Sequence, residues 1–211
     1  MRHYTVGKNE YPSATTVIHI LGSDRLMTWA NIMGFKHRKI SDILDETSAY
    51  GTLAHSIARK IVDPTAPDPP DVDGPGMTLL RIINLEKRVR SFVKDHDIVA
   101  LMTEFEMISE SYGFGGTCDL FGSITIDNVR YDDMIMDWKT AKSVHSTMWL
   151  QLGAYNLLLK EKGYNPKGAC IIRISDQGVH CDKIDNETLD LYSEAFLKLL
   201  DFYKFWGNTD D

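Results

Sequence analysis

The stretch VRYDDMIMDWKT, residues 129–140, has the pattern of a β-strand that becomes buried. The apolar residues 134–136 lead directly into Asp137-Trp138-Lys139, so two charged side chains follow a segment that is suited to burial. The two segments before it, 99–111 and 114–126, also alternate with a period of two residues. We therefore predict three successive strands in the middle of the chain, and these strands decide the fold class.

Helical patterns and one hairpin surround these strands. The expected helices cover 13–21, 24–36, 42–62, 77–96, 146–162 and 187–206, and the expected hairpin pairs 168–175 with 178–184. Gly51 interrupts the third helical pattern, so a helix that begins only there is an alternative. Helices before and after a central block of strands are typical of a sheet with helices packed on it. We predict an α/β fold with a central mixed β-sheet flanked by helices.

Length and composition favour one globular domain. The chain has 211 residues, and its 43% hydrophobic and 25% charged residues exclude a disordered or fibrous protein. We expect a single domain over 1–211, with a helical N-terminal region over about 1–62. A loop is expected at 63–76, because five of the seven prolines lie there.

Charge and cysteine content argue against several classes of protein. A net charge of −7 disfavours coating of nucleic acid or membranes by bulk charge, although it is compatible with a local basic patch. Three cysteines without CxxC spacing disfavour a disulfide framework or a zinc ribbon, and they favour the cytoplasm. The sequence has no run of 18 apolar residues and no apolar run near its start, so neither a membrane span nor a signal peptide is expected.

Familiar nucleotide-binding and hydrolase motifs are absent from the sequence. It contains no GxxxxGK[ST] loop, GxGxxG turn, GxSxG elbow or HExxH helix. Nucleotide hydrolysis, dinucleotide redox chemistry and serine hydrolysis are therefore disfavoured. What remains is a set of acids and one lysine on the central strands.

Asp137 and Lys139 are the sharpest candidates for chemistry. They are two residues apart on a strand, so their side chains share one face while Trp138 points away. A carboxylate and an ammonium at the end of an apolar strand are costly to desolvate unless both act on something. A divalent cation together with a phosphate would use both charges. The alternative is a surface ion pair on an edge strand.

Five further residues could join them: His55, Glu104, Asp119, Gln151 and Tyr155. Asp119 follows a pair of glycines at a strand start, and Glu104 precedes it by fifteen residues, far enough to lie on the neighbouring strand. Gln151 and Tyr155 share a helix face at i, i+4 spacing. Taken singly, each has an ordinary explanation, such as a solvated strand face, an amphipathic helix border or a common helical histidine.

The motifs occur in the order GTxxH, an acid-bearing strand, GGTxD, DWK and QxxxY. In this order and spacing the sequence resembles the RecB-like branch of the PD-(D/E)XK nuclease superfamily. The resemblance covers about residues 11–160 and is nearest to phage exonucleases and the mitochondrial genome maintenance exonuclease. The family's motifs match PSAT at 12–15, GTLAH at 51–55, GTCD at 116–119, DWKT at 137–140 and, less fully, LQLGAY at 150–155.

The resemblance implies a restriction-endonuclease-like core and a metal site. His55, Asp119 and Asp137 would hold a Mg²⁺ or Mn²⁺ ion, with the backbone carbonyl of Trp138 as a further ligand. Glu104 matches an acid of the family's preceding strand and would ligate through water or a second ion. An iron–sulfur cluster, which some relatives carry on four cysteines, is not expected in a chain with three.

The resemblance also implies a reaction. Lys139 would position the attacking water or neutralise the scissile phosphate, while Gln151 and Tyr155 would orient the lysine or contact the DNA backbone. The expected function is a metal-dependent exonuclease on single-stranded DNA ends, in the cytoplasm of a bacterium or a phage-infected cell. A recombination, helicase or single-strand-binding protein would be its partner. The alternatives are a structure-specific endonuclease of the junction-resolvase type and a catalytically idle nucleic-acid-binding module.

A shared metal site sets a condition on the strand register. Two carboxylates on paired antiparallel strands share a face only if they are in register or displaced by an even number of residues. A two-residue turn at Asp127-Asn128 would place Asp119 opposite Met136 and leave Asp137 on the wrong face. We therefore predict a loop of odd length or a β-bulge between Asp119 and Asp137.

Overall fold

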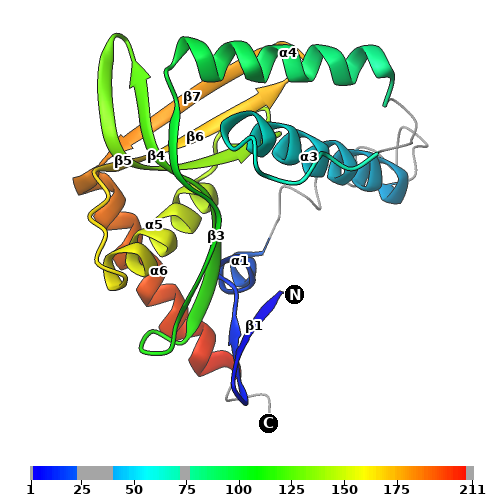
Figure 1. Ribbon diagram of the computed structural model, residues 1–211. Helices are drawn as coiled ribbons and strands as arrows, with labels where there is room; N and C mark the ends of the chain where they lie inside the picture. Colours follow the sequence, from blue (N-terminus) through cyan, green and yellow to red (C-terminus); the bar gives the residue numbers. More distant parts are fainter. Residues whose placement is uncertain (1, 23–39, 72–76, 208–211) are drawn as a thin grey trace.

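The computed structural model describes residues 2–22, 40–71 and 77–207 and is built around a five-stranded sheet (Figure 1). Its strands lie in chain order: β3 (Val99–Ser109), β4 (Phe114–Ile126), β5 (Val129–Lys139), β6 (Gly168–Ser175) and β7 (Gly178–Asp185). Neighbouring strands are antiparallel except β5 and β6, which are parallel. A helix connects these two, as a parallel pair requires. The predicted α/β fold with a mixed central sheet is confirmed.

Helices cover both faces of the sheet and enclose two hydrophobic cores. They are α1 (Ala14–Ile18), α3 (Ile40–Val62), α4 (Leu79–Asp95), α5 (Ser146–Glu161) and α6 (Asn186–Gly207), with a 3₁₀ turn, η1 (His19–Leu21), after α1. One face packs against α1, α5 and α6, and the other against α3 and α4. Along β5, Ile135 belongs to the first core, whereas Met136 and Trp138 belong to the second. Burial on both faces explains the continuous apolar run of this strand.

Two helix ends lie where local sequence signals place them. Ser13 caps α1, because its Oγ accepts a hydrogen bond from the backbone N–H of Thr16 at 3.0 Å. After α5, Gly163 adopts a φ of 87°, and the N–H of Tyr164 donates to the carbonyl of Leu159. Both ends depend on residues close in sequence, which is why the sequence could predict them.

The N-terminal region differs from the helical region predicted over about 1–62. It begins with a β-hairpin of β1 (His3–Val6) and β2 (Asn9–Pro12), which turns at Gly7 with a φ of 61°. Tyr4 is the buried residue of β1, so these short strands lack the alternation of apolar and polar residues by which a strand is predicted from sequence. Helix α3 also runs through Gly51 instead of beginning there.

Three further sequence predictions concern the loop at 63–76, the helix at 24–36 and the absence of a membrane span. Residues 63–71 form no helix or strand, in agreement with the predicted loop. The rest of that loop, 72–76, and the predicted helix over 24–36 lie outside the described residues. Within 2–22, 40–71 and 77–207, no helix is both long enough and apolar enough to cross a membrane.

The β4–β5 hairpin contains the predicted bulge. Its turn, Asp127-Asn128, has two residues with φ angles of 51° and 62°, as in the tight turns that match strand twist. Farther along, Asp132 and Asp133 of β5 together lie opposite the single residue Ser123 of β4. Asp133 has a φ of 54°, so the extra residue is accommodated by a left-handed backbone conformation.

This bulge changes which residues face each other at the far end of the hairpin. Leu120 pairs with Met136, and the next positions, Asp119 and Asp137, are therefore level. The predicted shift of register by a bulge is confirmed, because a two-residue turn without a bulge would have placed Asp119 opposite Met136.

A second irregularity brings β3 into the same alignment. The register of β3 and β4 shifts at Leu101, and the pairs on either side of Glu104 place it opposite Asp119. Gly122 lies beside this shift, where an added Cβ would be 2.1 Å from the carbonyl oxygen of Val99. Only glycine fits such a backbone approach. Three acids thus come from corresponding positions of three adjacent strands.

Candidate metal centre

The candidate site lies where β4 and β5 separate. Their pairing ends at Leu120 and Met136, whereas β5 stays paired with β6 as far as Lys139. In the gap, Oδ2 of Asp119 accepts a hydrogen bond from the backbone N–H of Trp138 at 3.0 Å. The carboxylate thus satisfies an amide that β4 no longer pairs with, and this bond holds it at the fork.

A histidine and two acids from three different elements meet at this fork. His55 of α3, Glu104 of β3 and Asp119 of β4 each offer a ligand atom, and these atoms lie within 4.8 Å of one another. Nδ1 of His55 is 3.2 Å from Oδ2 of Asp119. Glu104 has a φ of 46°, an uncommon conformation for a residue with a side chain, and such strain concentrates at functional sites. A nitrogen and several carboxylate oxygens form a donor set that suits a divalent cation.

Asp137 adjoins this group from β5 and contacts Lys139. The Asp137 side chain is 1% exposed, and its Oδ2 lies 2.5 Å from Nζ of Lys139. The two side chains therefore share a face, as their spacing predicted. Oδ1 of Asp137 is buried without a hydrogen-bond partner among the described residues, and the ion pair leaves that oxygen unsatisfied. A buried carboxylate oxygen of this kind is costly, and a bound cation would relieve the cost.

The acids of the site differ in how readily they ionise. Burial raises the pKa of Asp137 to about 6, despite the opposing charge of Lys139. Burial also raises the pKa of Glu104, and the charge of Asp119 adds to this effect. Burial acts on Asp119 in the same direction, but the hydrogen bond and charge of His55 outweigh it and lower the pKa of Asp119. Asp119 is therefore the acid most firmly held as a carboxylate.

The acids of the site favour the charged forms of its basic groups. Burial alone would lower the pKa of His55, but the hydrogen bond and charge of Asp119 raise it above its usual value. Burial likewise acts to lower the pKa of Lys139, and the charges of Asp137 and Asp119 reverse the effect and raise it. Lys139 is thus a cation at neutral pH, with its charge directed at the fork.

Gln151 and Tyr155 approach from the opposite side, on α5. Nε2 of Gln151 donates a hydrogen bond to the Tyr155 hydroxyl at 2.6 Å, so the two residues share a helix face, as their spacing predicted. An added Cβ on Gly116 would lie 2.6 Å from the Tyr155 ring, so the glycine permits α5 to pack closely on β4. Burial raises the pKa of Tyr155 well above its usual value, and its hydroxyl stays protonated.

The N-terminal wall of the site was not predicted from the sequence. A cavity of about 250 Å³ contains His55, Glu104, Asp119, Lys139, Gln151 and Tyr155, and it is also lined by Arg2, Tyr4 and Thr117. The Tyr4 hydroxyl lies 3.0 Å from Oγ1 of Thr117, and Nη2 of Arg2 donates to that oxygen at 3.2 Å. Thr117 lies inside the GGTxD motif and could have been inferred from it. Arg2 and Tyr4 reach the site only because the β1–β2 hairpin folds back onto β4.

Comparisons with known proteins leave the site to be interpreted from its own geometry. No protein-family model and no curated protein matches this chain. Among solved structures, a similar chain is the one titled "Crystal structure of SSO0001", at 14% sequence identity and a TM-score of 0.37. The match covers 92% of this chain and 79% of that chain.

Proposed function

We propose that this protein is a metal-dependent deoxyribonuclease with a PD-(D/E)XK core, acting as an exonuclease on single-stranded DNA ends. The observation that carries the proposal is the grouping of His55, Glu104 and Asp119 at the strand fork, beside the buried Asp137–Lys139 pair. A set of acids with one lysine suits a reaction in which a phosphate gains negative charge.

The residues present fit a divalent cation. His55, Glu104 and Asp119 would hold it, and the unsatisfied carboxylate of Asp137 and the carbonyl of Trp138 are further candidate ligands. Carboxylate oxygens suit Mg²⁺ or Mn²⁺, and the imidazole favours tolerance of Mn²⁺. When bound, such an ion polarises a phosphoryl oxygen and lowers the pKa of a bound water.

The protein's own side chains supply orientation and charge. Lys139 is a cation held by Asp137, so its ammonium can neutralise a phosphate or orient an attacking water at the fork. Tyr155 keeps its proton and can donate a hydrogen bond toward a strand in the cavity, while Gln151 fixes its hydroxyl. The intact set of acids and lysine favours an active enzyme over an idle binding module.

A cleavage assay tests this proposal. Single strands labelled at the 5′ or 3′ end, duplexes and covalently closed circles would be incubated with Mg²⁺, Mn²⁺ or EDTA. We expect the linear single strands to be degraded with either ion, and both EDTA samples and closed circles to stay intact. Cleavage of the circles would instead indicate an endonuclease, and intact substrates under all conditions would leave the binding-module alternative.

A further inference from the structure

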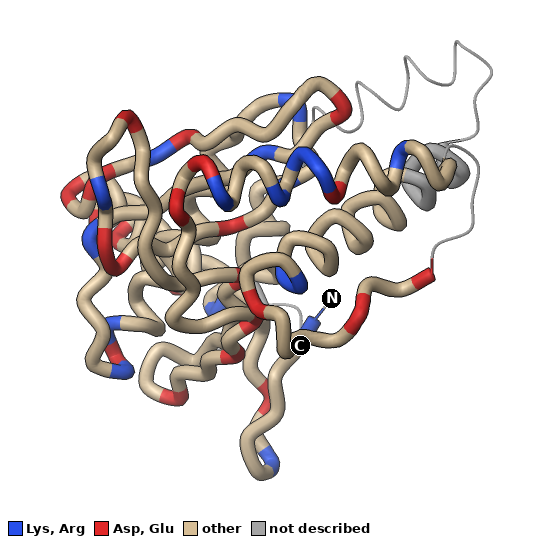
Figure 2. Tube along the Cα trace, turned by 45° about the horizontal axis from the view of Figure 1, so that its top comes forward, with Lys and Arg blue, Asp and Glu red and all other residues tan. Residues whose placement is uncertain are grey.

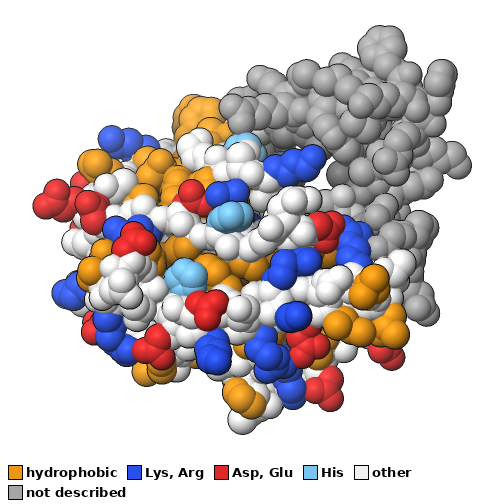
Figure 3. Space-filling view, turned by 90° about the horizontal axis from the view of Figure 1, so that it is seen from above, with side chains coloured by type: hydrophobic (Ala, Val, Ile, Leu, Met, Phe, Trp, Pro, Cys, Tyr) orange, Lys and Arg blue, Asp and Glu red, His pale blue; other side chains and the backbone are white. Residues whose placement is uncertain are grey.

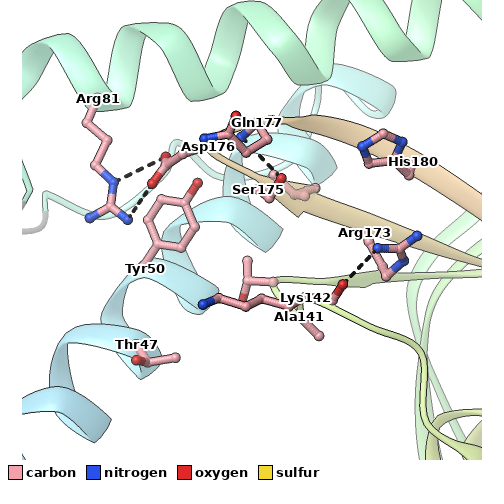
Figure 4. A pocket seen from close by; sticks show the side chains of 12 residues that line it. Thr47, Tyr50, Arg81, Ala141, Lys142, Arg173, Ser175, Asp176, Gln177 and His180 are labelled. Carbon is pink, nitrogen blue, oxygen red and sulfur yellow. Dashed lines mark hydrogen bonds and ion pairs between the residues drawn. The ribbon is translucent and has the colours of Figure 1, made fainter.

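A second and larger cleft lies next to the metal centre, on the side of α3 away from the N-terminal hairpin. Its volume is about 740 Å³, and it is bounded by α3, the start of α4, the residues after β5 and the β6–β7 turn. Figure 4 shows Tyr50, Arg81 and Lys142 around this space, with Arg173 and His180 farther along β6 and β7. None of these residues belongs to the metal centre described above.

The cleft has an excess of positive charge although the chain as a whole carries −7. Asp176 is shared by two guanidinium groups, those of Arg81 at 3.1 Å and Arg88 at 3.5 Å. Arg173 forms one ion pair with Asp182 at 2.7 Å. Lys142 is exposed and has no acidic partner among the described residues. Among the described residues, four cationic side chains therefore face two carboxylates in and around the cleft.

This charge is local. Basic residues are spaced along α4 (Figure 2), and the face seen in Figure 3 carries Lys, Arg and His side chains beside acidic ones, not a continuous basic surface. A ligand that is attracted here must therefore present its negative charge at the cleft itself.

A buried hydroxyl marks the floor of the cleft. Tyr50 is 8% exposed, and its hydroxyl has no hydrogen-bond partner of normal geometry among the described residues, although Arg88 lies close to it. The guanidinium of Arg81 lies over the Tyr50 ring at 4.3 Å from its centroid, so this face of the ring is not open to a stacking base. The cleft therefore presents positive charge and a hydroxyl that can donate a hydrogen bond, and both features suit an oxyanion.

The cleft and the metal centre are bordered by the same two chain segments. Thr140 and Lys142 follow Lys139 by one and three residues, and both line the cleft. Thr140 also packs against Gly51 of α3, where an added Cβ would be 3.3 Å from its Oγ1. Gly51 lies one helical turn before His55, so a single helix and a single strand border both sites.

We propose that this cleft binds a backbone phosphate of the same DNA strand whose cleaved bond lies at the metal centre. The inference rests on the proposed nuclease function. Lys142 supplies a cation that has no acidic partner among the described residues, the Arg81–Asp176–Arg88 group supplies positive charge, and the hydroxyl of Tyr50 donates a hydrogen bond. A phosphate held here fixes the strand on one side of the cleaved bond.

Strand binding without metal tests the proposal separately from cleavage. A fluorescent single-stranded oligothymidylate would be titrated in EDTA at several salt concentrations, with fluorescence anisotropy as the readout. Lys142→Gln should weaken binding about threefold to tenfold and reduce the slope of log K against log salt by about 0.7, as expected for one lost phosphate contact. Tyr50→Phe should weaken binding without changing that slope, because it removes a donor and no charge.

The matched control is Lys167→Gln, an exposed lysine just before the opposite end of β6, which should behave as wild type. Wild-type affinity and slope in Lys142→Gln would overturn the cleft assignment, even if the wild-type protein cleaves DNA. Lys142-dependent binding without cleavage under any metal would support the cleft and overturn the nuclease proposal. A wild-type protein that neither binds nor cleaves the strand would overturn both.

Discussion

Asp137→Asn is expected to lower metal-dependent DNA cleavage by about 10²-fold or more while the protein stays folded. The amide keeps the size of the side chain but removes the charge that holds Lys139 and that would face a cation. Asp119→Asn and Lys139→Gln should have effects of similar size, because each removes a different charge from the same fork. Initial rates on a labelled single strand, with circular dichroism as a check of folding, measure the effect.

Asp133→Asn is the matched control for this variant. Asp133 lies on the same strand, undergoes the same loss of charge, and is exposed at the bulge. Its φ of 54° suits asparagine as well as aspartate, so the backbone tolerates the change. We expect wild-type rates from Asp133→Asn. A folded Asp137→Asn protein with wild-type rates would contradict the assignment of the site.

Binding of Mn²⁺ should weaken by about tenfold or more when the pH falls from 7 to 5. Burial raises the pKa of Asp137 to about 6, so this carboxylate takes up a proton over this range. Burial also raises the pKa of Glu104, which favours its protonation in the same direction. His55 acts in the same direction, because its pKa is raised and only its neutral ring can bind a metal. All three groups bind more protons as the pH falls, and each bound proton competes with the cation.

Calorimetric titration at the two pH values measures this change, with circular dichroism to verify that the protein is folded at pH 5. In Asp137→Asn, the affinity at pH 7 should be lower and the pH dependence shallower, since one competing proton has been removed. An affinity that is constant or increases on acidification would show that these groups do not hold the ion.

The sequence was sufficient to predict those parts of the fold and the site that depend on local interactions or on a periodic pattern. The two-residue period of β3, β4 and β5 predicts the sheet, and the spacing of Asp137 and Lys139 predicts their shared face. Parity alone required a loop of odd length or a bulge before Asp119 and Asp137 could be level. The position of that bulge was not predictable, because it depends on Asp133 adopting a left-handed conformation that its residue type permits but does not require.

The parts that escaped prediction depend on packing between distant segments. Tyr4 reaches the metal centre through a hairpin whose strands carry almost no apolar signal, and its position is fixed by contacts with Thr117. The second cleft joins Tyr50, Lys142 and Asp176, which are separated by long stretches of chain. Gly51 looks like a helix interruption in the sequence, yet α3 continues through it close to Thr140.

Anomalous scattering from a crystal soaked in Mn²⁺ tests the assignment of His55, Glu104, Asp119 and Asp137 to one divalent-cation site. This assignment predicts an anomalous peak at the fork of β4 and β5, within coordination distance of Asp119 and of at least one other residue of this set. A Mn²⁺ peak elsewhere on the molecule, with none at the fork, would contradict it.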